Sequence, residues 1–253
     1  MLMFATSPAA YSSLDPHDVP YRIISPPRDQ GKCATCTAFV AVTAAEAAAA
    51  SVLGQDVTKV GELSPQDLYY CGDDRTSCDT GAGLKATLGQ LEKRQLLLED
   101  CLPYQQPDLR GVATRQQLCA KSCADTSPLA SKGSFSYVPI TQLWKAQQHI
   151  RQYEAVVTRF DLYSDFKTFF ADYKNVEAVY RPSPGSKITE GHAITLVGYD
   201  NVNQFWIARN SWGPGFAQDG NFKVGAGHGL GPLLAAAAAI NTTTSQIDQD
   251  HGG

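Results

Sequence analysis

An alanine-rich run over Cys36–Leu53, CTAFVAVTAAEAAAASVL, constrains the fold more than any other part of the chain. Alanine has the highest helix propensity of all residues, and Gly54 follows where a C-terminal cap belongs. Ser64 and Pro65 then supply an N-cap and a first-turn proline for a second, short helix. A third helix is expected over about Gly83–Lys93. The first half of the chain is therefore predicted to be helical.

The second half has a different pattern, with short β-branched and aromatic runs separated by Gly, Asn and Asp. The runs YEAVVTRFDL, HAITLVGY, QFWIARN and GNFKV predict antiparallel strands. A helical half followed by a sheet half predicts an α+β fold with two lobes and an active-site cleft between them.

The expected domain covers residues 14–240, with a helical lobe over about 28–130 and a β lobe over about 131–225. Ala235–Ala239 is interpreted as a helical or strand-like packing segment. Residues 1–13 are expected to be a flexible N-terminal segment, and the polar residues 241–253 a disordered tail.

Composition excludes several classes of function. The chain has 253 residues, 43% of them hydrophobic, and a net charge of -4 with scattered basic residues, so no stripe could neutralise nucleic-acid phosphates. No apolar run reaches the roughly 20 residues of a membrane span, and the start, MLMFATSPAAYSS, lacks a signal-peptide pattern. We therefore expect no nucleic-acid or membrane partner, and a chain that either lacks a signal peptide or is a processed piece.

All seven cysteines lie in the first half, at positions 33, 36, 71, 78, 101, 119 and 123. In a reducing compartment they would be buried thiols or metal ligands, whereas in the secretory pathway six would pair and one would remain. The gaps between Cys33 and Cys36 and between Cys119 and Cys123 suit zinc ligands, but no histidine pair supports such a site. We expect no metal.

Three residues in separate segments could together perform thiol catalysis. Cys36 stands at the first turn of the predicted helix, where unpaired amides and the helix dipole favour a thiolate. His192 begins one predicted strand and Asn210 ends another, so both could face the helix start across the cleft. Thiol catalysis needs a nucleophile, a base and a group that orients the base. We predict these roles for Cys36, His192 and Asn210, respectively.

Three blocks resemble the papain-like cysteine peptidase family from about residue 14 to residue 225: DQGKCATCTAF, GHAITLVGYD and NSWGPGFAQDGNF. They correspond to its nucleophile, histidine and asparagine segments, in the same order. The resemblance implies that Gln30 and the Cys36 backbone amide hold the oxyanion, and that Trp212 shields the His192–Asn210 bond. It also implies that Gly81 pairs with substrate backbone.

The cysteine pattern is most similar to the cathepsin C branch, on the strength of LSPQDLYYC, the step from Cys71 to Cys78, and CLPY followed by two more cysteines. Spacing alone permits 15 pairings of six cysteines. The resemblance implies the pairs Cys33–Cys78, Cys71–Cys119 and Cys101–Cys123. It also implies a location in the secretory pathway, either lysosomal or vacuolar, or extracellular.

The family resemblance implies a cysteine endopeptidase that works through a thioester without a cofactor. The chain shows neither a long propeptide nor the exclusion domain that makes cathepsin C a dipeptidyl peptidase, so we expect endopeptidase activity. Expected partners are peptide or protein substrates and protein inhibitors, and the expected state is a monomer. Arg159, beside Ala82, would favour acidic or polar side chains in the S2 pocket, and Glu190 would border the site. The alternative is that both charged side chains are solvated.

Several residues depart from the family pattern. Thr37 replaces the usual tryptophan after the nucleophile, Thr80 replaces the first glycine of a pair, and Phe216 replaces another tryptophan. Thr37 and the irregular start YRIISPPRDQG support a rival hypothesis, a catalytically inactive relative that binds peptides or a protein through the cleft. Acyl transfer to an amine is a third possibility, because it shares the acyl-enzyme. Asn241 begins a glycosylation sequon.

Overall fold

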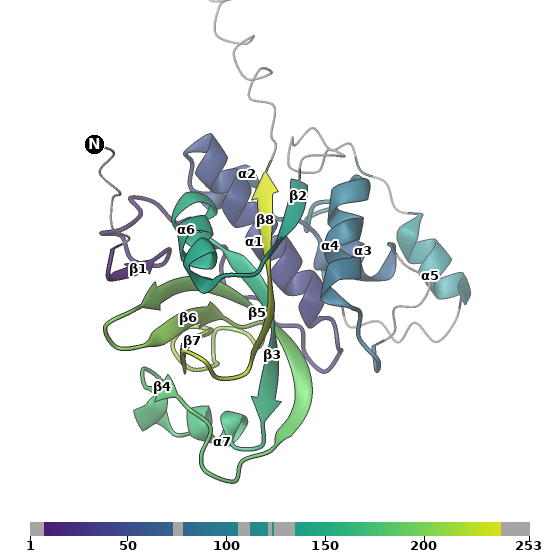
Figure 1. Cartoon of the computed structure of the whole chain (residues 1–253). Coiled ribbons are helices and arrows are strands. Elements are labelled where there is room, and N and C mark those ends of the chain that lie inside the picture. Colours follow the sequence, from purple (N-terminus) through teal and green to yellow (C-terminus); the bar gives the residue numbers. More distant parts are fainter. Residues whose placement is uncertain (1–7, 73–77, 106–111, 121–122, 124–134, 239–253) are drawn as a thin grey trace, which may run out of the picture.

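The structure is a computed structural model that describes residues 8–72, 78–105, 112–120, 123 and 135–238 (Figure 1). Its helices are α1 (Cys36–Leu53), α2 (Val57–Val60), α3 (Pro65–Tyr70), α4 (Leu84–Lys93), α5 (Val112–Cys119), α6 (Leu143–Tyr153) and α7 (Phe166–Ala171), with a short 3-10 helix at Tyr173–Asn175. Its strands are β1 (Ala10–Ser12), β2 (Phe135–Ile140), β3 (Val156–Tyr163), β4 (Val179–Tyr180), β5 (Ile188–Asp200), β6 (Phe205–Arg209), β7 (Asn221–Gly225) and β8 (Leu230–Ala238). The prediction for the tail and for Asn241 falls outside the described residues.

Helix α1 has the predicted bounds and forms the centre of the fold (Figure 1). It ends at Gly54, whose φ of 61° is left-handed, as the predicted cap requires. By length and composition α1 could cross a membrane, but 14 of its 18 residues are buried within the protein. Its apolar surface is therefore explained by packing in the protein core.

One charged residue, Glu46, lies within this buried helix and is fully paired. Its carboxylate accepts hydrogen bonds from Arg28 Nη2 at 2.8 Å, Leu63 N at 2.7 Å and Ser25 Oγ. Burying a carboxylate is costly unless it is paired and hydrogen-bonded, and these three donors meet that need. Glu46 thus ties α1 to the segment that leads into the site.

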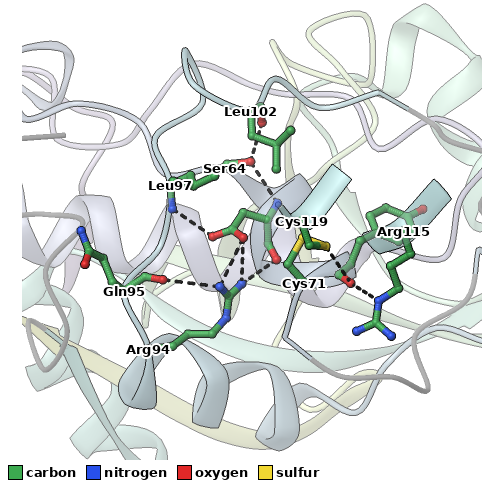
Figure 2. The surroundings of a disulfide bond; sticks show 10 residues. Ser64, Cys71, Arg94, Gln95, Leu97, Leu102, Arg115 and Cys119 are labelled. Carbon is green, nitrogen blue, oxygen red and sulfur yellow. Dashed lines mark hydrogen bonds and ion pairs between the residues drawn. A yellow bond between two sulfur atoms is a disulfide. The ribbon is translucent and has the colours of Figure 1, made fainter. Parts of the chain in front are cut away.

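Hydrogen bonds, an ion pair and a disulfide connect the segments around α3 in the helical lobe (Figure 2). Ser64 caps α3 as predicted, because its Oγ accepts a bond from Asp67 N at 3.0 Å. Arg94, which follows α4, pairs with the Asp67 carboxylate at 3.2 Å. The Cys71–Cys119 disulfide joins the end of α3 to the end of α5. These contacts hold the helices that surround α1.

The sheet has the strand order β2-β8-β3-β5-β6-β7-β4, and β1 pairs with β5 off this path. All its pairings are antiparallel except β4–β7, which is parallel. Ala10–Ser12 pair with β5 and so belong to the sheet, although this segment was expected to be flexible. Ala235 lies in strand β8, in line with the strand-like interpretation of this segment, and β8 extends the sheet beyond residue 225, where the β lobe was expected to end. The parallel β4–β7 pair was not expected.

Two hydrophobic clusters confirm the predicted α+β, two-lobed organisation. The first surrounds α1 and includes Val157 and Ala193 from the sheet, and the second lies between the sheet, α6 and α7. Because α1 packs against β5 and β8 as well as against helices, it lies between the helical lobe and the sheet.

Candidate active site

Cys36 is the first residue of α1 and the only cysteine of the seven outside a disulfide. Its thiol is partly buried. Burial raises the pKa of this thiol, and backbone N–H groups of Ala193, Thr37 and Cys36 itself bond to the sulfur and oppose the rise. Ala193 follows His192 on β5, so the sulfur lies close to the strand that carries the predicted base.

His192 and Asn210 form a buried hydrogen bond of 2.8 Å between Nε2 and Oδ1. Asn210 Oδ1 also accepts the Ser211 backbone N–H at 2.8 Å, which identifies this atom as the oxygen of the amide. An amide oxygen can only accept, so Nε2 of neutral His192 carries the proton. Nδ1 is therefore the nitrogen that is free to take a proton from a thiol.

Trp212 covers this pair. Its ring stacks on the His192 imidazole with 4.9 Å between centroids and an interplanar angle of 29°. Lys167 Nζ lies over the Trp212 ring, 5.2 Å from its centroid. The same ammonium group pairs with the Glu190 carboxylate at 3.2 Å. Excluding water in this way strengthens the His192–Asn210 bond.

Electrostatics at His192 are dominated by burial. Burial lowers the pKa of His192 to about 4, while the Asn210 hydrogen bond and the charge of Glu190 raise it and Lys167 lowers it. Burial also raises the pKa of Cys36, so at both residues it favours the uncharged form, the thiol of Cys36 and the neutral imidazole of His192. An ion pair therefore depends on the mutual attraction of thiolate and imidazolium and on the amides that bond the sulfur.

Gln30 is buried beside the nucleophile segment. Its Nε2 donates to the Cys33 carbonyl at 2.8 Å, and its Oε1 accepts a bond from Ser211 Oγ at 2.6 Å. An amide nitrogen has two hydrogens, so one N–H of Gln30 remains to donate to an oxyanion. The Gln30 backbone also bonds to Ser211, with N to O at 2.9 Å, which joins the two lobes at the site.

Two residues that support the site were not predicted from the sequence. Ser211 orients Gln30, and Tyr104 donates from its hydroxyl to the Gln30 carbonyl at 2.9 Å. The Tyr104 hydroxyl also lies 2.9 Å from Thr35 Oγ1, next to the nucleophile. Ser211 belongs to the NSWG block and Tyr104 to CLPY, and both blocks were identified in the sequence. Their contacts with Gln30 were not predicted, because the residues are far apart along the chain.

Gly81 and Ala82 lie beside the nucleophile segment. The Cys33–Cys78 disulfide and a 2.7 Å bond from Ala34 N to the Cys78 carbonyl hold their loop there. Gly81 has a φ of 68°, and a Cβ at this position would lie 3.2 Å from the Ala34 carbonyl oxygen. The position therefore favours glycine and leaves backbone accessible. The remaining implied pair, Cys101–Cys123, is also a disulfide in the structure.

Arg159 and Glu190 are exposed and each forms an ion pair. Arg159 lies opposite Ala193 in the β3–β5 register and pairs with Asp161 at 2.7 Å, with 57% of its side chain exposed. It therefore lies on the sheet face that packs toward α1. Among the described residues, no group of His, Cys, Asp and Glu side chains is arranged to hold a metal ion.

Comparison with known proteins gives a family match over most of the chain. Residues 11–242 match the family described as papain family cysteine protease. The chain is 30% identical over 217 residues to cathepsin B-like CP3 of Giardia intestinalis, covering 83% of this chain and 65% of that protein. It is 28% identical to cathepsin J of Mus musculus, covering 81% and 58%, respectively. The chain thus spans less than two thirds of these curated relatives.

Solved structures have the same fold. The digestive procathepsin L2 proteinase of Tenebrio molitor aligns with a TM-score of 0.70 and 21% identity, covering 94% of this chain and 70% of that one. Procathepsin B S9 of Trypanosoma congolense aligns with a TM-score of 0.71 and 18% identity, covering 93% and 79%. At these identities the likeness supports the fold alone, and the assignment to the cathepsin C branch stays a prediction.

Proposed function

Because the chain belongs to the papain family of cysteine proteases, we propose that it is a cysteine endopeptidase with Cys36 as nucleophile. The observation that carries this proposal is the 2.8 Å bond between His192 Nε2 and Asn210 Oδ1, beside the only free thiol. That bond leaves Nδ1 of His192 available as the base for Cys36.

The reaction begins when His192 Nδ1 takes the Cys36 proton and the thiolate attacks the carbonyl carbon of the scissile peptide bond. The oxyanion receives hydrogen bonds from the Cys36 backbone N–H and from the free N–H of Gln30 Nε2. Collapse of this intermediate breaks the C–N bond, and His192 gives its proton to the leaving amine. Water then attacks the thioester, with His192 as base, and releases the acid and the thiol. No cofactor is needed.

The inactive relative is the main rival. Its best support, Thr37, is buried in the helix start, where Thr87 Oγ1 donates to Thr37 Oγ1 at 3.2 Å. The hydrogen bonds of His192 and Gln30 are present although Thr37 stands in place of the usual tryptophan. Acyl transfer to an amine would use the same thioester and differ only in the acceptor.

Arg159 gives the proposed enzyme a preference for acidic side chains at P2. It lies on the sheet face toward α1, opposite Ala193, whose amide bonds the nucleophile. The ion pair with Asp161 offsets the positive charge of Arg159, whose side chain is largely exposed. The preference should therefore be modest, about fivefold or less in kcat/KM. The solvated alternative predicts no preference at all.

Three disulfides support a location in the secretory pathway, lysosomal or vacuolar, or extracellular, because such bonds persist in oxidising compartments. The proposed partners are peptide or protein substrates and protein inhibitors, and the proposed state is a monomer.

Hydrolysis of fluorogenic peptides with Glu, Leu or Arg at P2, in mild reductant, tests the proposal. We expect turnover by the native enzyme and none by a folded Cys36→Ala variant. Arg159→Gln should remove the preference for Glu at P2, and Arg181→Gln, at an exposed position in the same lobe, should not. Binding of the peptides without cleavage would favour the inactive relative. Product analysis with an added amine separates hydrolysis from acyl transfer.

A further inference from the structure

An open cavity lies between residues 13–27 and the end of strand β6. Its volume is about 590 Å³, which is within the range of small-molecule sites. Residues 13–27 supply all of its lining except Arg209, the last residue of β6. Cys36, His192 and Asn210 do not line it, so this cavity is separate from the candidate active site.

Two hydrogen bonds fix the position of the Arg209 guanidinium. Its Nη1 donates to the Ser25 carbonyl at 3.0 Å, and its Nε donates to Asn221 Oδ1 at 2.8 Å. Ser25 belongs to the cavity lining, and the bond to its carbonyl holds the guanidinium against this wall. Arg209 therefore meets the cavity with its charged end and not with its aliphatic stem.

The guanidinium of Arg209 also has donors that the protein does not use. A guanidinium carries five N–H groups, and the two bonds just described leave Nη2 without a partner among the described residues. Nη2 is not one of the fully buried side-chain atoms that lack a partner there, so it reaches solvent. Arg209 also lines a cavity of about 10 Å³, which holds one water molecule at most. Of these two cavities, only the larger can hold a ligand.

The positive charge of Arg209 has no direct counter-charge. The residue is buried, with 7% of its surface exposed, and no carboxylate of the described residues lies within ion-pair distance of it. Burial and the charge of Arg28 lower the pKa of Arg209 to about 10, which leaves it charged at neutral pH, and Asp219 acts on it only through longer-range attraction. Glu46 pairs with Arg28 and not with Arg209. Because a buried charge is costly without a partner, the cavity favours an anion.

The rest of the lining indicates what kind of anion fits. Its other charged residues are Arg22 and Asp15, so two positive charges face one negative charge. Asp15 Oδ1 accepts the His17 N–H at 2.9 Å, and its carboxylate pairs with neither arginine. The net charge of the lining suits a monoanion. Most of the remaining surface is apolar and includes Leu14, Val19, Pro20, Tyr21, Ile24 and Pro26.

We propose that this cavity binds a small organic carboxylate, with the carboxylate on the Arg209 guanidinium and an apolar group against the apolar part of the lining. The carboxylate supplies the missing counter-charge through a charge-assisted hydrogen bond with Nη2. The apolar group gains by leaving water, which a bare inorganic ion cannot do. The proposal does not depend on the peptidase reaction, so it and the proposed function are tested separately.

NMR titration of the native protein with phenylacetate tests the proposal, and phenylacetamide is the uncharged ligand of the same shape. We expect phenylacetate to bind at least about tenfold more tightly than phenylacetamide, because a hydrogen bond to a charged group is lost in the amide. It should also bind about tenfold or more tightly than acetate, which lacks the phenyl ring. Equal binding of either control ligand, or no binding of phenylacetate, would overturn the proposal.

Arg209→Gln identifies the residue responsible and should weaken phenylacetate binding about tenfold or more. Arg181→Gln is the matched control, because Arg181 is exposed and outside the cavity lining, and it should keep the native affinity. Native affinity in a folded Arg209→Gln variant would refute the assignment. If that variant does not fold, the Nε–H signal of Arg209 in the native protein gives the answer. It should shift with phenylacetate and not with phenylacetamide, and an unchanged signal while phenylacetate binds would also refute the assignment.

A free acid and the C-terminus of a peptide present the same two groups to this cavity. N-acetylphenylalanine mimics the C-terminus and distinguishes the two sources in the same titration. Tighter binding of N-acetylphenylalanine than of phenylacetate assigns the carboxylate to a peptide C-terminus, and weaker binding assigns it to a free acid.

Discussion

Replacing Asn210 by alanine should lower kcat far more than it changes KM. The substitution removes a buried 2.8 Å bond to His192 and touches no substrate-binding residue. Hydrogen bonds to charged groups contribute about 1.5 to 3 kcal/mol, and this one stabilises the imidazolium formed when Cys36 gives up its proton. At about 1.4 kcal/mol per factor of ten, kcat should fall about 10- to 150-fold.

The assay is fluorogenic peptide hydrolysis, normalised to the concentration of titrated thiol. Asn201→Ala is a suitable control, because Asn201 is exposed in the turn after β5, where it accepts a bond from Gln147. Its kcat should match that of the native enzyme. An unchanged kcat in Asn210→Ala, or a loss confined to KM, would refute the reasoning, since another group would then orient the base.

Two further predictions concern buried charge. In Cys36→Ala no thiolate can attract the imidazolium, so burial should hold the pKa of His192 at about 4, and NMR titration checks this. The pKa of an unfolded histidine is about 6.5, so below that pH the unfolded state binds more protons than the folded state. The stability of Cys36→Ala should therefore fall as pH drops from about 6.5 to 4. A pKa of His192 near 6.5 in this variant would show that burial does not lower it. Glu46→Gln should destabilise the protein by about 3 kcal/mol in urea unfolding, because it leaves Arg28 without its buried partner. Glu177→Gln, at an exposed site, should unfold as the native protein does.

Local signals predicted the helical lobe well. The bounds of α1 follow from its alanine content and from Gly54, and Ser64 caps α3 as its sequence indicates. Such features depend on neighbours within one or two turns, so sequence alone contains them. The strands β3, β5, β6 and β7 overlap the four predicted runs, although β5 begins at Ile188, before the predicted run that starts at His192.

Local sequence patterns did not predict contacts between residues far apart in the chain. Ser211 reaches Gln30 across 181 positions of the chain, and β1 joins the sheet through a register with Gly198 to Asp200. The disulfide pairs were implied by resemblance, because spacing left 15 arrangements open.

The central claim is that Cys36 is the catalytic nucleophile, and alkylation tests it most directly. Unreduced protein is treated briefly with iodoacetamide at mildly acidic pH, and peptide mapping is followed alongside peptidase activity. Because the other six cysteines are in disulfides, label should appear at Cys36 alone. Activity should fall in equal proportion to the label. Full labelling of Cys36 with activity retained, or activity lost through label at another cysteine, would contradict the claim.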